Sequence, residues 1–138
     1  MAFLLDTNVV SELRKVNPNA GVLSWYHDHA DAEVFLSCLV LGEIRQGIER
    51  LRRRHSPKAD LLEQWVVGLL STYHDRILPV TAEIAEVWGQ LNVPPSPPPV
   101  VDGLMAATAK VHRLTLATRN VSDVVRTGVR LVNPFTPT

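Results

Sequence analysis

The sequence predicts an α/β protein with a short, mainly parallel sheet covered by helices on both faces. Short apolar segments of strand length alternate with longer segments of helical periodicity, the pattern of parallel α/β folds. The chain has 138 residues, the size of one domain, and 46% of them are hydrophobic, which suits a packed core. We therefore expect residues 1–138 to form one domain.

The first half of the chain is predicted to contain two strands and four helices. The apolar run Ala2–Leu5 is a strand that ends at a carboxylate, Asp6, and the helix after it stops at Asn17-Pro18. Ser56-Pro57 separates two further helices that carry apolar stripes. The expected strands are 2–5 and 33–38, and the expected helices are 7–16, 22–26, 39–54 and 58–73.

The second half adds short strands and two helices. A strand at 76–80 contains a proline, which favours the edge of the sheet. Thr81 with Glu83 starts a helix that continues to residue 91, because a threonine suits the cap and an acid suits the first turn. The proline-rich segment 94–99 is a rigid loop. A helix at 100–112, a strand at 114–118 and a candidate fifth strand at 129–132 complete the expectation.

Charge and cysteine usage indicate the compartment and restrict the partners. The 14 basic and 14 acidic residues give a net charge of zero, which by itself argues against non-specific binding to nucleic acid. The signs nevertheless fall into blocks, acidic in 1–40 and 64–102 and basic in 41–63 and 103–138. One cysteine, no signal-peptide pattern and no apolar run of membrane-spanning length predict a soluble, cytoplasmic protein without membrane association.

Acidic residues follow the predicted strands or begin the helices next to them. Asp6 ends the first strand, Glu43 lies one helical turn beyond the second, and Asp102 lies in the first turn of the helix before the fourth. Asn120 and Asp123 follow that fourth strand. Each alone could be a helix cap or a loop residue. Because ligands bind at the carboxyl ends of parallel strands, the set together indicates a functional site.

Clustered carboxylates at such an edge suit a hard divalent cation such as Mg²⁺ or Mn²⁺, which relieves their mutual repulsion. Such a cation can activate water and neutralise charge on a phosphodiester. The sequence contains no Walker A loop, no dinucleotide-binding glycine pattern and no serine-hydrolase elbow. NTPases, cofactor dehydrogenases and serine hydrolases are therefore disfavoured.

Several short motifs follow one another along almost the whole chain. They are LLDTNVVSE (4–12), GEIRQG (42–47), RILPV (76–80) with Trp88-Gly89, DGLMAATA (102–109), LTLATRNV (114–121) and NPF (133–135). In this order they resemble the motifs of the PIN-domain family, and within it the VapC-type toxins. The resemblance implies a three-layer α/β/α fold with about four to five strands. It also implies an Mg²⁺- or Mn²⁺-dependent endoribonuclease that forms a homodimer, or a larger toxin–antitoxin assembly, and is silenced by a cognate antitoxin.

The resemblance also implies roles for individual residues. Asp6 and Asp102 match the principal metal ligands, and Glu43 matches the third acidic position. Many members have aspartate where this chain has Asn120, so either Asn120 or Asp123 supplies the fourth position. The catalytic set is then Asp6, Glu43, Asp102 and Asp123, with Thr7, Asn8, Thr118 and Arg119 as the expected substrate-binding residues.

Two other functions compete with this interpretation. Asn120 is compatible with a degenerate module that holds RNA or an antitoxin without cutting. A haloacid-dehalogenase-like phosphohydrolase fits less well, because Asn8 stands where that chemistry needs an acid.

The basic cluster 50–58 is either a solvated helix end or a surface for RNA phosphates or an antitoxin.

Overall fold

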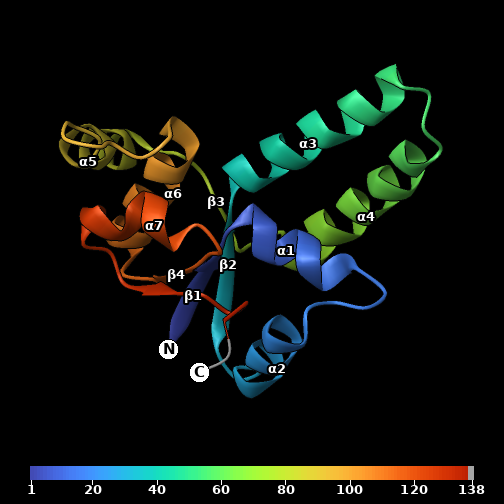
Figure 1. The fold of residues 1–138 in the computed structure, drawn as a ribbon, viewed down its shortest axis with the longest axis horizontal. Helices are drawn as coiled ribbons and strands as arrows, with labels where there is room; N and C mark the ends of the chain where they lie inside the picture. Colours follow the sequence, from blue (N-terminus) through green and yellow to red (C-terminus); the bar gives the residue numbers. More distant parts are fainter. Residues whose placement is uncertain (137–138) are drawn as a thin grey trace.

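The computed structural model describes residues 1–136 and contains a five-stranded sheet in the order β3-β2-β1-β4-β5 (Figure 1). All four neighbouring pairs are parallel. The sheet confirms the predicted fold class, and β3 lies at an edge as its proline indicates. The strands are β1 (Ala2–Leu5), β2 (Glu33–Ser37), β3 (Ile77–Leu78), β4 (Thr115–Ala117) and β5 (Leu131–Val132).

Helices cover both faces of the sheet. Figure 1 shows α1, α2 and α4 to one side of the strands and α5, α6 and α7 to the other, while α3 and α4 form a long hairpin that projects from the body. The helices are α1 (Thr7–Arg14), α2 (Ala20–Asp28), α3 (Cys38–Arg53), α4 (Lys58–Tyr73), α5 (Ala82–Leu91), α6 (Val100–His112) and α7 (Val121–Val124), followed by a 3₁₀ turn at Val125–Thr127. In residues 1–136 no helix is long and apolar enough to span a membrane.

Two local expectations from the sequence are wrong. Cys38 begins α3 and does not end β2, because the Ser37 hydroxyl accepts a hydrogen bond from the Leu39 N–H at 3.1 Å and caps the helix. The segment 121–127 is helical although it reads as a loop, since a helix of one turn is too short to show periodicity. Its Val124 is buried and attaches it to the core.

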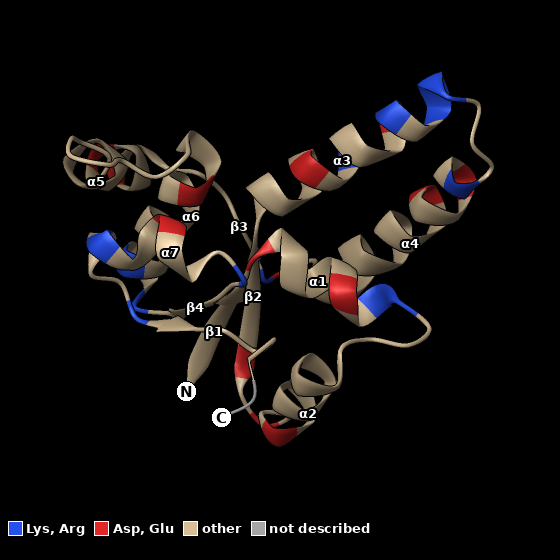
Figure 2. Ribbon diagram, in the orientation of Figure 1, with Lys and Arg blue, Asp and Glu red and all other residues tan. Residues whose placement is uncertain are grey.

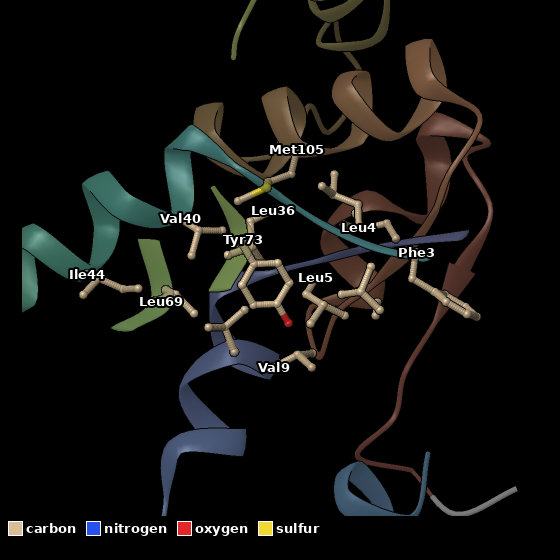
Figure 3. Close-up of a cluster of buried hydrophobic side chains, with 14 of the residues drawn as sticks. Phe3, Leu4, Leu5, Val9, Leu36, Val40, Ile44, Leu69, Tyr73 and Met105 are labelled. Carbon is tan, nitrogen blue, oxygen red and sulfur yellow. The ribbon is translucent and has the colours of Figure 1, made fainter. Parts of the chain in front are cut away.

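The central strands bring the site residues to one edge of the sheet. Leu4, Leu36 and Leu116 lie on β1, β2 and β4 and are at most 1% exposed, as expected for strands covered on both faces. Figure 3 shows Leu4 and Leu36 within the core. The Asp6 N–H continues the ladder by donating to the Ala117 carbonyl at 2.9 Å. Asp6 is therefore fixed at the carboxyl edge of the sheet, where α1 starts.

Helix α6 packs closely against α5, and this contact positions the turn that carries Asp102. A Cβ atom at Gly103 would collide with the Asn92 side chain and lie 3.1 Å from Cδ1 of Trp88. The Asn92 side chain has little freedom to move, because its Nδ2 donates to the Pro98 carbonyl at 3.2 Å. A residue without a side chain is therefore needed next to Asp102.

We predict that Gly103→Ala destabilises the protein by about 1–2 kcal/mol, since the overpacking outweighs the better helix propensity of alanine. The control is Gly68→Ala on α4, where an added Cβ meets no atom within 4 Å. That substitution should stabilise the fold by about 0.5–1 kcal/mol. Urea denaturation measures both, and equal effects of the two substitutions would contradict the close α5–α6 contact.

Candidate active site

The Asp6 carboxylate is buried between β1, β4 and the start of α1. It is 5% exposed, and its Oδ1 accepts the Thr7 N–H at 2.8 Å while its Oδ2 accepts the Thr118 hydroxyl at 2.7 Å. Burial raises the pKa of Asp6, and the hydrogen bonds from Thr118 and Thr7 oppose that rise because they favour the ionised form. The carboxylate is thus held in one orientation at the sheet edge.

Glu43 is attached to the same place from α3. Its Oε1 accepts a hydrogen bond from the Thr7 hydroxyl at 2.5 Å, so Thr7 contacts the carboxylates of Asp6 and Glu43 through two different groups. Glu43 is only partly exposed. The sequence places this residue one turn beyond β2, and the hydrogen bond explains why a glutamate lies in an otherwise apolar helical turn.

Asp102 lies in the first turn of α6 and experiences the charges of the other acids. Burial, followed by the negative charges of Asp6, Asp123 and Glu43, raises the pKa of Asp102 to about 6. Asp6 lies between β1 and α1, and the other three carboxylates come from α3, α6 and α7. Figure 2 shows acidic segments in each of these regions around the sheet edge. The structure therefore brings together the four predicted acids.

The segment after β4 completes the surroundings. Thr118 is 1% exposed, and its hydroxyl oxygen also accepts the Asn120 N–H at 3.0 Å. The Asn8 Oδ1 accepts the Arg119 N–H at 3.2 Å, which joins α1 to the loop after β4. Asn120 precedes α7, whose first turn holds Asp123. Of the two residues, Asp123 is the one whose charge acts on Asp102.

Arg119 has a contact that the sequence did not reveal. Its guanidinium carbon lies 4.5 Å from the centroid of the Phe135 ring. Arg119 is exposed, and its charge lowers the pKa of Glu12, after the stronger effects of Lys15 and Asn19. Only the NPF motif signalled Phe135, and nothing in the sequence linked it to Arg119.

The donor set fits a hard cation that keeps most of its own water. Within residues 1–136, no group of three or more His, Cys, Asp or Glu side chains is arranged so that it could hold a metal ion. Mg²⁺ seldom needs such a group and is usually bound through one or two carboxylates together with water and substrate oxygens. Burial is the largest cause of the raised pKa of Asp102, and the negative charges of Asp6, Asp123 and Glu43, which such an ion would relieve, add to it.

Comparison with known proteins agrees with this architecture. Residues 3–122 match the family model of the PIN domain. Toxin FitB of Neisseria gonorrhoeae is 33% identical over 136 residues, covering 96% of this chain and 97% of that protein. VapC ribonuclease Y4jK of Sinorhizobium fredii is 31% identical over 140 residues, covering 97% of this chain and 98% of that protein. The crystal structure of FitAcB from Neisseria gonorrhoeae superposes with a TM-score of 0.80 at 31% identity, covering 98% of this chain and 99% of that one.

The chain therefore belongs to the PIN domain family, as its motifs led us to expect. These two relatives match over 97% and 98% of their own length.

We predict that Thr118→Val destabilises the protein by about 1–3 kcal/mol, because the Asp6 carboxylate loses a donor and the Asn120 N–H loses an acceptor. Thr108→Val is the control, since the Thr108 hydroxyl only bonds the carbonyl of Leu104 one turn earlier in α6. Chemical denaturation should show a much smaller change for the control. Equal losses of stability in the two variants would show that the hydrogen bond from Thr118 to Asp6 contributes no more than the bond within α6.

The raised pKa of Asp102 predicts how stability depends on pH. Because its folded pKa of about 6 lies above the ordinary 3.8, the folded state binds the proton more tightly, and stability is lost as pH rises between these values. In the absence of divalent metal, Asp102→Asn should therefore raise the Tm at pH 8 and raise it less at pH 4. Thermal scans across this range, with Asp31→Asn at an exposed site as control, test the sign. An equal rise in Tm for Asp102→Asn at pH 4 and pH 8 would contradict the predicted pH dependence.

Proposed function

We propose that the protein is a metal-dependent endoribonuclease and the toxin of a toxin–antitoxin pair. The observation that carries the proposal is the grouping of Asp6, Glu43, Asp102 and Asp123 at the carboxyl edge of the sheet. The names of the relatives, a toxin and a VapC ribonuclease, support the same activity. Residues 1–138 act in this proposal as one PIN domain.

Asp6 and Asp102 are the proposed ligands of Mg²⁺, which Mn²⁺ can replace. When bound, the ion neutralises charge on the phosphodiester and lowers the pKa of water. Thr118 and the Thr7 N–H orient the Asp6 carboxylate, and their hydrogen bonds favour its ionised form against the burial that raises its pKa. Asp123 provides the fourth acidic position in this assignment, because its charge reaches Asp102, whereas Asn120 is neutral.

Glu43 is the proposed acceptor of the proton from the attacking water. Its Oε1 is occupied by the Thr7 hydroxyl, which leaves Oε2 to take the proton. Thr7, Asn8 and Arg119 border the acids, and in this proposal they orient the RNA backbone around them. Thr118, which the sequence also predicted to bind substrate, is only 1% exposed and acts through its hydrogen bond to Asp6. Arg119, exposed beside Phe135, has the planar donor fork that suits a phosphate.

The proposed partners follow from the family. In this proposal the protein forms a homodimer. A cognate, VapB-like antitoxin binds the homodimer and blocks its nuclease activity. Support comes from the toxin name of the Neisseria relative and from the VapC-type motifs. Because the substrate is cellular RNA, the cytoplasm is the proposed compartment.

We predict that the purified protein cleaves single-stranded RNA with Mg²⁺ or Mn²⁺ and not in EDTA. Asp6→Asn and Asp102→Asn should each lower kcat by roughly 10²–10⁴-fold, because each removes a charged ligand while leaving its shape. Circular dichroism checks the fold of both variants, and Asp31→Asn is the exposed acidic control.

Cleavage that persists in EDTA would exclude the metal-dependent mechanism. RNA binding without cleavage under any divalent cation would favour the degenerate binding module. A covalent phosphate on Asp6 would instead favour the phosphohydrolase alternative.

A further inference from the structure

Helix α3 connects the acidic site to the tip of the projecting hairpin. Glu43 lies near its start and Arg50 follows seven residues later, while Arg54, eleven residues later, is the cap residue directly after its end. At 100° and 1.5 Å per residue, both arginines fall within about 20° of the direction of Glu43, about 10 Å and 16 Å along the helix. One face of α3 therefore carries a site carboxylate at one end and two arginines at the other.

The face of α3 that contacts α4 has its charges neutralised. The Arg45 guanidinium donates to both oxygens of Glu63 at 2.8 and 2.7 Å, and Arg52 donates to Glu63 at 2.8 Å. These two arginines lower the pKa of Glu63 to about 2. Arg52 also lies 3.6 Å from Glu49. The basic residues on this face are committed to holding the hairpin together.

The remaining arginines of the tip are not committed in this way. Arg50, Arg53 and Arg54 are exposed, and none of them forms an ion pair with another residue of the described range 1–136. Between Glu43 and Arg50 the same face presents Gly47, where an added Cβ would meet nothing within 4 Å. Figure 2 shows the basic segments gathered at the far end of α3. At Gly47, between the acids and the arginines, this face therefore has free space.

We propose that Arg50, Arg53 and Arg54 form a phosphate track that holds the backbone of single-stranded RNA a few nucleotides from the bond that is cut. The inference rests on the proposed nuclease function and adds the residues that bind substrate. A cluster of acids repels RNA, so attraction must come from cations outside it. Arg50 and Arg54 lie on the helix face that continues from Glu43, and Arg53 lies about 80° to one side of that face. Arginine also suits phosphate, because its planar fork donates two hydrogen bonds at once.

The test compares two variants that lose the same charge. One is R50Q/R53Q/R54Q, and the control is K110Q/R113Q/R126Q at the end of α6 and in the 3₁₀ turn. On a single-stranded RNA of about 16 nucleotides, a length typical of extended binding sites, the track variant should raise KM about tenfold with kcat nearly unchanged. The slope of log KM against log salt should fall by about 2, at about 0.7 per lost contact with single-stranded RNA. Both variants should cut a dinucleotide, which cannot reach the tip, as the wild type does.

Other results overturn the proposal. Unchanged KM and salt slope in the track variant, or equal changes in the control, would show that the arginines do not bind substrate. A lower Tm with lower kcat would assign them to the helix end alone. If the track variant cleaves RNA normally but no longer binds poly-glutamate, the three arginines form a surface for an acidic protein instead. If the wild type cuts no RNA with Mn²⁺, the proposed function itself fails, and the track fails with it.

Discussion

The buried carboxylate of Asp6 is the constraint on which the rest of the site depends. Removing a carboxylate from water is costly unless hydrogen bonds replace its hydration. Here Thr118 from the loop after β4 and the N–H of Thr7 at the start of α1 supply those bonds. The Asp6 N–H also extends the sheet by bonding the Ala117 carbonyl. One residue therefore joins two neighbouring strands and a helix at the edge of the sheet.

The other acids gather around this fixed charge and gain no stability from doing so. Burial raises the pKa of Asp102, and the negative charges of Asp6, Asp123 and Glu43 raise it further, to about 6. A structure selected only for stability would avoid such an arrangement, whereas functional sites commonly retain such a cost. The same logic explains the neutral total charge, since an acidic site and basic blocks such as the tip of α3 cancel in the sum.

The sequence predicted what depends on local pattern and missed what depends on packing. The run Ala2–Leu5 and the acid after it identify β1 and the site, because burial on both faces leaves an uninterrupted apolar segment. The helix α7 was missed because one turn has no periodicity, although it carries Asp123. The stacking of Arg119 on Phe135 joins distant parts of the chain, and the basic tip divides into paired and unpaired arginines only when α3 and α4 lie side by side. Such long-range contacts leave no signal in a single sequence.

The central claim is that the grouped carboxylates form a site for a divalent cation. Calorimetric titration of the protein with Mn²⁺, without RNA, tests it directly. The account predicts saturable binding to the wild type, and a large loss of affinity in Asp6→Asn and in Asp102→Asn but not in Asp31→Asn. Equal Mn²⁺ affinity in all four proteins, or no binding to any, would contradict it.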